Sequence, residues 1–418
     1  MSMLQPYPKY KAINLPWLKE IPEYWDIKKI RNYFTERKCK VSDKDYPALS
    51  VSKHGVVPQL ETACKTDYGD NRKLVKEGDF VINSRSDRKG SSGISPADGS
   101  VSLINIVLEP RFINRIFINY LFKSNLFIEE FYRNGRGIVA DLWTTRYQEM
   151  RNISFPIPPK DEQEKIVAYL DERIAKIDKY ISAETEKIKL LRELKNAEIS
   201  QAVTRGLNPN VKYKAIDLPW LKEIPEHWKT RKAKYLFNKE KRAVRANDEV
   251  ITCFRDGQVT LRKNRRLRGF TESISEIGYQ GIRKGDLVIH QMDAFAGAIG
   301  VSDSDGKGTS VYHCCTGKEP ICPMYYAYLL RQMAKSGFIQ SLYRGIRERS
   351  SDFNFPIFGK QFILVPPLSE QEKIVAYLDE KIAKIDKAIS AIQQKIDLMK
   401  EYKSSLISSV VTGKVMVS

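Results

Sequence analysis

The chain has 418 residues, of which 42% are hydrophobic and 10% aromatic, a composition typical of folded domains and not of disordered chains. At this length we expect more than one domain. No run of 18 apolar residues occurs and the N-terminal segment lacks the apolar core of a secretory signal, so we expect no membrane span and a cytoplasmic location.

The net charge of +19 is unevenly distributed. Residues 26–160 hold 23 basic and 16 acidic residues, and residues 229–362 hold 24 and 13, whereas segments 161–228 and 363–418 are close to neutral. A basic excess confined to two regions predicts a polyanionic partner, most often nucleic acid. A merely solvated basic surface is the alternative.

The chain repeats itself. Tyr10–Trp25 reads YKAINLPWLKEIPEYW and Tyr213–Trp228 reads YKAIDLPWLKEIPEHW, and we call each of these a tryptophan segment. The prolines inside both copies disfavour helix. A period this long indicates two copies of a domain and not a solenoid.

The regions that follow the two tryptophan segments differ in sequence but share local features. Glu77–Asn83 matches Lys284–His290, and in both a Gly-Asp pair precedes largely apolar residues, which predicts a turn that leads into a buried strand. We then expect a helix, a basic glycine loop, and a last strand that ends in Pro-Pro.

Each copy ends in a long heptad pattern, at Gln163–Gly206 and Gln371–Gly413. Apolar residues recur at alternating steps of three and four, which predicts a coiled-coil helix, and the economical partner for each helix is the other. The principal residues of these two heptad seams are Leu170, Ile174, Ile177, Ile181, Ile188 and Leu191 in the first copy, and Leu378, Ile382, Ile385, Ile389, Ile392, Ile396 and Met399 in the second.

The candidate DNA contacts are basic and amide side chains in the two globular regions, because arginine and lysine can hold phosphates or read guanine, and amides can read adenine. They follow the buried strand, occupy the glycine loops, or belong to the most basic stretch of the chain. They are Arg85, Arg88, Lys89, Arg133, Arg136, Arg262, Lys263, Asn264, Arg265, Arg266, Arg268, Gln291, Arg344 and Arg347. A solvated face or a structural role is the alternative for each.

The sequence lacks a dinucleotide-binding glycine motif, a P-loop and an Asn-Pro-Pro-aromatic methyltransferase motif. The six cysteines show no CxxC pair, so buried apolar thiols are preferred to a zinc site. We therefore expect no catalytic, cofactor-binding or metal-binding residues in this chain.

Two junctions lead into the long helices, Pro158–Glu164 (PPKDEQE) and Pro366–Glu372 (PPLSEQE). With the duplicated layout and the Gly-Asp strand, they make the chain resemble the specificity subunit of a type I restriction–modification system. The resemblance implies an α+β fold, in which two β-rich α/β target recognition domains are separated by two long antiparallel coiled-coil helices with an internal pseudo-two-fold repeat.

The resemblance also implies a function without catalysis. Each globular domain would read one half of a bipartite, asymmetric target in double-stranded DNA, and the helices would set the gap and dock two methyltransferase subunits. Restriction subunits could join, and S-adenosylmethionine, ATP and Mg would bind only to partner subunits. The expected boundaries are residues 1–160 for the first domain, 161–206 for the central helix, 207–362 for the second domain and 363–418 for the last helix.

Two other classes of function remain open from the residues alone. A stand-alone DNA methyltransferase or nuclease would bind S-adenosylmethionine or a divalent metal by itself. A coiled-coil scaffold that does not bind DNA would show no salt-dependent duplex binding.

Overall fold

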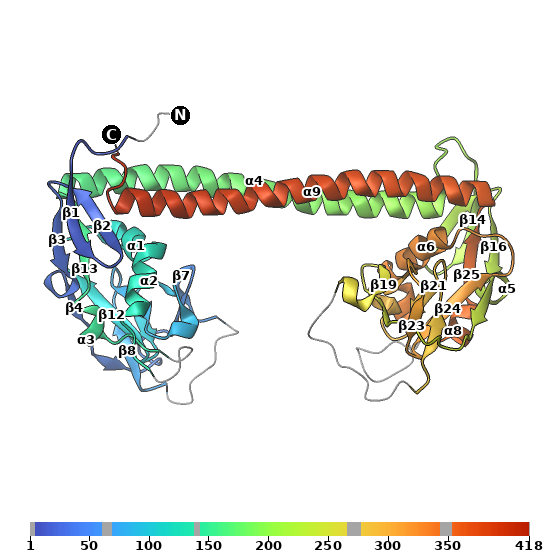
Figure 1. The fold of residues 1–418 in the computed structure, drawn as a ribbon, viewed down its shortest axis with the longest axis horizontal. Coiled ribbons are helices and arrows are strands. Elements are labelled where there is room, and N and C mark those ends of the chain that lie inside the picture. The colour runs from blue at the N-terminus through green and yellow to red at the C-terminus, as the bar shows by residue number, and fades with distance from the viewer. Residues whose placement is uncertain (1–4, 61–68, 138–142, 266–276, 343–352, 418) are drawn as a thin grey trace. The chain divides into compact units, whose positions relative to one another are not determined.

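The computed structural model describes residues 5–60, 69–137, 143–265, 277–342 and 353–417 (Figure 1). The chain divides into two compact units: unit 1 is Met1–Thr185 with Gln393–Ser418, and unit 2 is Glu186–Ile392. Within the described ranges, no helix combines the length and the apolarity that crossing a membrane requires.

Unit 1 is built around a four-stranded antiparallel sheet in the order β10-β9-β12-β4. Its strands are β4 (Phe34–Glu36), β9 (Phe80–Asn83), β10 (Ser92–Ile94) and β12 (Asn105–Pro110). The strand expected after the Gly-Asp pair is β9, and its four residues are all buried. Smaller sheets extend the unit: β11-β8-β5, β6-β7 and β13-β3.

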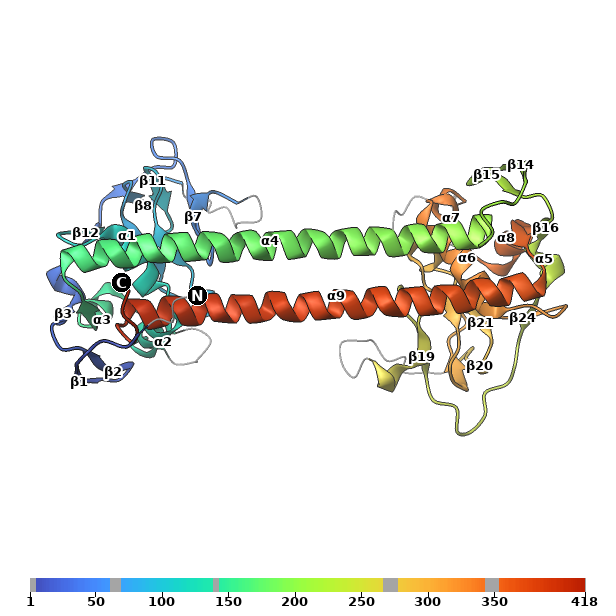
Figure 2. The ribbon, with the colours of Figure 1, turned by 90° about the horizontal axis from the view of Figure 1, so that it is seen from above.

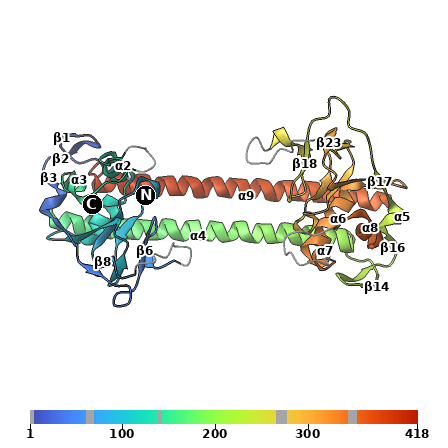
Figure 3. The same cartoon turned by 90° about the horizontal axis from the view of Figure 1, so that it is seen from below.

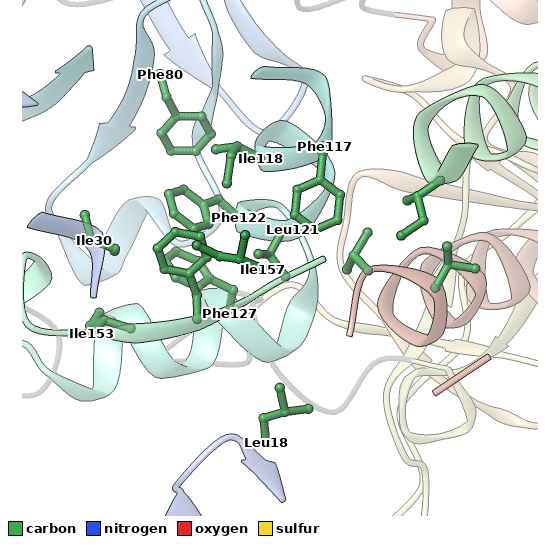
Figure 4. Packing of buried hydrophobic residues seen from close by; sticks show 14 of the residues in the cluster. Leu18, Ile30, Phe80, Phe117, Ile118, Leu121, Phe122, Phe127, Ile153 and Ile157 are labelled. Carbon is green, nitrogen blue, oxygen red and sulfur yellow. The ribbon is translucent and has the colours of Figure 1, made fainter. Parts of the chain in front are cut away.

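The bounds of the remaining unit 1 elements are β3 (Asp26–Lys29), β5 (Lys40–Val41), β6 (Leu49–Ser52), β7 (Gly55–Pro58), β8 (Arg72–Val75), β11 (Gly99–Val101), β13 (Ser154–Ile157), α1 (Arg115–Phe122), α2 (Asn125–Arg133) and α3 (Tyr147–Met150). Figure 4 shows how the aromatic side chains of β9 and of helices α1 and α2 point into one core. The rings of Phe122 and Phe127 stack there, with centroids 4.1 Å apart.

Unit 2 repeats this plan with the sheet β17-β24-β21-β22. In the opposite direction, β22-β21-β24-β17 corresponds to β10-β9-β12-β4 of unit 1. Its elements are β16 (Lys229–Lys232), α5 (Ala233–Leu236), β17 (Phe237–Glu240), β18 (Ile251–Cys253), β19 (Val259–Leu261), β20 (Gln280–Ile282), β21 (Leu287–His290), β22 (Ile299–Val301), β23 (Gly306–Gly308), β24 (Tyr312–Gly317), α6 (Pro323–Lys335), α7 (Phe338–Ser341), α8 (Phe355–Lys360) and β25 (Phe362–Val365).

Two neighbouring thiols of β24 illustrate the alternation of the strand. Cys314 packs into a small cluster on one face of the sheet, and Cys315 packs into the main core of unit 2 on the other. Burial raises the pKa of the Cys314 thiol to about 12, so it stays neutral and behaves as a small apolar side chain. Within the described ranges no cluster of three or more His, Cys, Asp or Glu residues could hold a metal ion.

Each tryptophan segment forms a hairpin, β1 (Tyr10–Leu15) with β2 (Leu18–Pro22) and β14 (Tyr213–Leu218) with β15 (Leu221–Pro225). The last tryptophan of each segment, Trp25 or Trp228, is fully buried. A buried indole must satisfy its N–H group. Trp25 Nε1 donates to Glu162 Oε2 and Trp228 Nε1 to Glu370 Oε2, both at 3.0 Å.

These glutamates explain the Glu-Gln pair in the two junctions. Each glutamate lies in the first turn of a long helix and fixes a tryptophan segment. The glutamine that follows it, Gln163 or Gln371, donates from Nε2 to the carbonyl oxygen of the first proline of its Pro-Pro pair, at 2.9 Å in both copies. The junction therefore ties the last strand, the hairpin and the helix together.

The long helices are α4 (Lys160–Arg205) and α9 (Leu368–Val411), each continuous through both units (Figure 2). In unit 1 the first part of α4 packs against the last part of α9, and in unit 2 the last part of α4 packs against the first part of α9. All thirteen predicted seam residues are buried or half-buried. The predicted α+β fold, with two β-rich parts and a paired antiparallel coiled coil, is confirmed.

A glycine in the left-handed region follows each long helix: Gly206 comes directly after α4, and Gly413 comes two residues after the end of α9, each with φ +74°. Glycine adopts this conformation without strain, which is why it commonly follows the last turn of a helix. At Gly206 a Cβ atom would also lie only 2.8 Å from Glu370 Oε1, so the glycine keeps room for the glutamate that holds Trp228.

Candidate nucleic-acid interface

In unit 1 a short segment, residues 143–145, joins the loop after β9 to the glycine loop after α2. Thr144 exchanges backbone hydrogen bonds of 3.0 and 3.1 Å with Arg136, and Thr145 N donates to Ser84 O at 2.9 Å. Tyr132 Oη, from the end of α2, donates to Asn83 O at 2.9 Å. Arg85, Arg88, Lys89, Arg133 and Arg136 are therefore carried on adjoining backbone segments, although almost fifty residues separate the two loops.

The charged ends of these five side chains differ in how tightly they are held. Arg133 pairs at 2.7 Å with Glu130, whose side chain is only 7% exposed, so it neutralises a buried carboxylate. Lys89 pairs with Glu129 at 2.5 Å and Arg85 with Asp87 at 3.5 Å. These three cations have acidic partners within unit 1, and of the three acids only Glu130 is buried.

Arg88 and Arg136 are the most exposed of the set, with side chains 69% and 83% accessible. Arg88 pairs with the exposed Asp87 at 3.9 Å, and Arg136 pairs at 3.4 Å with Glu149, whose side chain is 15% exposed. The Arg88–Asp87 pair lies at the surface and contributes little stability, and the guanidinium of Arg136 stays open to a phosphate because its own side chain is so exposed. Within unit 1 these two arginines are best placed to meet a polyanion.

Sequence reasoning missed aromatic and basic neighbours of these loops. A cavity of about 600 Å³ beside Lys89 and Arg133 is walled by Trp17, Tyr132 and Trp143. Trp143 is 37% exposed, and an exposed indole next to cations can stack on a base. The signal was available, because a tryptophan in a polar loop close to a basic glycine loop is unusual.

A second cavity of about 650 Å³ in unit 1 lies next to Arg85 and is lined by Arg146 and Lys73. Arg146 is exposed, whereas Lys73 donates to Asn105 O at 2.8 Å. Arg146 is a further basic residue at this surface that the sequence patterns did not single out.

In unit 2 the start of the basic stretch lies at the end of the β18–β19 hairpin. Lys263 pairs with Glu249 at 2.5 Å, and Asn264 Nδ2 donates to Thr260 Oγ1 at 2.9 Å. Arg262 is half-buried and its Nε donates to Thr252 Oγ1 at 3.3 Å. The hairpin thus fixes the backbone from which these side chains extend.

Arg265 is the most constrained residue of this stretch. Its guanidinium pairs with Asp256 at 2.6 Å and lies 4.3 Å from the ring centroid of Phe254. The hydrogen bond from Arg265 is the main cause that lowers the pKa of the Asp256 carboxyl. Arg266, Arg268, Arg344 and Arg347 lie outside the described residues.

Gln291 follows β21, at the position that corresponds to the loop after β9. Its backbone is fixed, because Gln291 N donates to Val311 O and Gln291 O accepts from Phe353 N, both at 3.0 Å. Arg255, in the turn of the β18–β19 hairpin, pairs with Asp293 of the same loop at 3.0 Å. The hairpin turn and the Gln291 loop are therefore neighbours in unit 2.

Beneath these divergent loops, the Gly-Asp pair has the same structural role in both units. Asp79 accepts a backbone hydrogen bond from Lys76 N and pairs with Arg37 at 2.7 Å. Asp286 accepts from Arg283 N and pairs with Arg242. In both units the aspartate closes the turn and pairs with an arginine. The turn is therefore constant, whereas the loops after β9 and β21 differ in sequence.

A scan of the chain against protein-family models matches none of them. The chain is 22% identical over 430 residues to the Type I restriction enzyme MjaVIII specificity subunit of Methanocaldococcus jannaschii, and this match covers 95% of the chain and 94% of that protein.

Two solved structures share the fold. One is a chain from a structure described as showing the complex assembly and conformational transition of the type I R-M system, with a TM-score of 0.67, 14% identity, and 94% and 99% of the two chains covered. The other is the HsdS subunit from Thermoanaerobacter tengcongensis, with a TM-score of 0.53, 16% identity, and 94% and 98% covered. The chain is thus similar in sequence, along nearly its whole length, to a type I restriction enzyme specificity subunit, and it shares the fold of the HsdS subunit, which confirms the predicted resemblance.

Proposed function

We propose that this chain is the sequence-specific, non-catalytic DNA-binding subunit of a type I restriction–modification complex. Each unit would carry one target recognition domain and read one half of a bipartite, asymmetric sequence in double-stranded DNA. The methyl transfer, and any cleavage, would take place on partner subunits that bind S-adenosylmethionine, ATP and Mg.

The strongest support for this proposal is that the same turn and sheet in the two units carry loops of different sequence. The Asp79 and Asp286 turns are the same, and both sheets have the same strand order, yet the loop after β9 is rich in arginine whereas the loop after β21 contains Gln291. A reader of two different half-sites needs a constant scaffold and variable side chains at the base edges.

A domain exchange tests this proposal. Residues 229–362 would be replaced with the corresponding domain of another specificity subunit, and the DNA of a host that carries the chimera and its methyltransferase would be sequenced for modified bases. We expect one half of the methylated sequence to change and the other to stay. A change in both halves, or in neither, would contradict the assignment of one half-site to each domain.

We also propose a methyltransferase-docking surface on the long helices. The outward face of α4 exposes Leu190 and Leu194, whose side chains are 54% and 44% accessible, and α9 exposes Leu398 and Tyr402, at 64% and 45%. The two pairs are 208 positions apart, the same offset that relates the two helices. Exposed apolar pairs at i and i+4, repeated once in each helix, suit two copies of one apolar partner surface.

Leu190→Glu and Leu398→Glu, separately and together, test the docking surface. Each single variant should retain one methyltransferase subunit per chain in co-purification, and the double variant should retain none. Leu207→Glu, which changes an exposed leucine outside the helices, is the control and should retain both. Two bound subunits in the double variant would show that docking uses another surface.

A further inference from the structure

A cavity of about 250 Å³ lies within unit 2 between α4, α6 and the loop after β21. Figure 3 labels the two helices, α4 and α6. Its wall includes the amide of Asn196 and the ring of Phe295, together with three cations, Arg255, Arg331 and Lys335. The function proposed above assigns no role to Asn196 of α4 or to Arg331 and Lys335 of α6.

Two of these cations have no acceptor within the part of the chain that the structure describes. Arg331 is half-buried and Lys335 lies at the rim, and among the described residues neither side chain makes a hydrogen bond or an ion pair. Burial is the main cause that lowers the pKa of both groups, and at Arg331 the charge of Asp256 offsets it only in part. An uncompensated, desolvated cation is unfavourable unless an anion joins it.

The nearby acids are already engaged. Asp256 is held by Arg265 at 2.6 Å, and Asp293 is held by Arg255 at 3.0 Å. The carbonyl end of α6, which closes with Lys335, contributes about half a negative charge. It offsets less than one of the two unpaired cations, so the cavity keeps a positive balance.

The β18–β19 hairpin packs against the guanidinium of Arg331 and fixes its position. Gly257 has φ +92°, and a Cβ atom there would lie 2.4 Å from Arg331 Nη1. The glycine allows the β18–β19 turn to close over the arginine without displacing it. Arg331 is therefore held in place by packing and not by a carboxylate.

Unit 1 does not repeat this set. The residue that corresponds to Lys335, 208 positions earlier, is Phe127, a buried ring stacked on Phe122. The residue that corresponds to Arg331 is Lys123. Lys123 is also a half-buried cation whose pKa is lowered by burial, so the cation at the Arg331 position recurs in unit 1, whereas its combination with Lys335 is specific to unit 2.

We propose that this cavity binds a phosphate group, with Arg331 and Lys335 as the charged ligands and Asn196 as an amide donor. Arginine presents a planar fork that matches two phosphate oxygens, and lysine adds a mobile point charge. The volume suffices for a single phosphate group with a small substituent. The phosphate could come from the backbone of bound DNA or from a free phosphate compound, and the test distinguishes these sources.

The first arm uses the full chain without DNA, and inorganic phosphate as the probe. Thermal unfolding is measured in phosphate and in chloride at equal ionic strength. Phosphate should raise the Tm of the wild type, of Arg331→Lys and of the exposed-lysine control Lys387→Gln. Arg331→Met and Lys335→Met should each bind phosphate about ten- to hundredfold more weakly, and Arg331→Met should not lower the Tm in chloride, because it removes an unpaired charge.

The second arm measures duplex binding as a function of salt. If the group is a DNA phosphate, Arg331→Met reduces the slope of log K against log salt by about 0.9. If the group is a free phosphate, the slope is unchanged while the response to inorganic phosphate is lost. Equal phosphate stabilisation and equal salt slopes in the wild type and in an Arg331→Met, Lys335→Met double variant would overturn the proposal, even if sequence-specific DNA binding is intact.

Discussion

Lys403 donates from the seam of α9 to both carboxylate oxygens of Asp178 on α4, at 2.7 and 2.8 Å. The mirrored contact, from Lys195 of α4 to Asp386 of α9, has distances of 2.7 Å to both oxygens. A lysine in a coiled-coil core is costly unless it finds an acid, so the two pairs favour one antiparallel register over its neighbours.

Reversing the charge of one residue in such an ion pair should destabilise the packing of α4 against α9. Exchanging the charges of both residues should restore it. Asp178→Lys places two ammonium groups together and should cost about 1 kcal/mol or somewhat more, since the pair is only partly buried. The double variant Asp178→Lys, Lys403→Asp should recover most of that loss. Chemical denaturation measures both values. Glu401→Lys, at an exposed position on α9, should have little effect.

Glu162 should be important for the stability of unit 1. It is buried and accepts hydrogen bonds from Tyr7 Oη at 2.6 Å, Tyr24 Oη at 3.2 Å and Trp25 Nε1 at 3.0 Å. Glu162→Ala leaves buried donors unpaired and should cost about 3 kcal/mol in the free energy of unfolding. Glu162→Gln keeps an acceptor and should cost less. Trp fluorescence during denaturation reports the loss, and an unchanged midpoint for Glu162→Ala would contradict this role.

Buried tyrosines should make the fold sensitive to alkaline pH. Burial raises the pKa of Tyr312 from 10.0 to about 12. Because the folded-state pKa is higher than the unfolded one, the stabilisation is complete below pH 10 and is lost as the pH rises from 10 towards 12. Over that window this tyrosine should remove about 1.4 kcal/mol of stability per pH unit. Tyr312→Phe should therefore show a shallower decline above pH 10 than the wild type, and parallel curves would contradict the prediction.

The repeated architecture could be predicted because its signals are local. The heptads of Leu170–Ile188, the Gly-Asp turn before β9 and the Pro-Pro junctions each fall within a few consecutive turns or residues, so periodicity and turn chemistry reveal them. The pairing of Lys403 with Asp178 was only half visible. Lysine stands at corresponding positions of the two heptad stretches, Lys195 and Lys403, which are 208 residues apart, but the sequence does not show the acid that each lysine meets.

The surface of the basic loops could not be predicted in the same way. Arg133 pairs with a buried glutamate, and Arg265 pairs with Asp256 and stacks on Phe254, so two attractive candidates carry structural duties. Trp143 reaches the loop after β9 through backbone bonds between residues almost sixty positions apart. Contacts of this kind depend on tertiary packing and leave no period in the sequence.

Arg88 and Arg136 give the clearest test of DNA contact in unit 1. Replacing both with Gln should weaken duplex binding and reduce the salt slope by about 0.9 for each phosphate contact that is lost. Arg133→Gln should instead lower the stability of the fold, because Glu130 would be left buried without its partner. Lys176→Gln, which removes one positive charge at an exposed position of α4, is the control and should leave the salt slope unchanged. Equal salt slopes for the wild type and the Arg88→Gln, Arg136→Gln variant would remove these residues from the interface.

The length of the long helices should determine the gap between the two half-sites. The Lys195–Asp386 and Lys403–Asp178 pairs place residues 180–193 of α4 opposite residues 388–401 of α9. Removing both segments deletes two heptads from each helix and keeps the seam in phase. Each helix becomes about 21 Å shorter at 1.5 Å per residue, which corresponds to about six base pairs at 3.4 Å each.

We therefore expect the shortened chain to select half-sites about six base pairs closer together from a duplex library with a randomised spacer length. Binding selection is the suitable readout, because the deletion also removes the proposed docking residues Leu190 and Leu398. Deleting 180–193 alone is the control, since it leaves the two helices mismatched and should destabilise the pair. An unchanged spacer in a stably folded double deletion would mean that the helices do not set the gap, since the half-sites themselves and the loops that read them are unaltered.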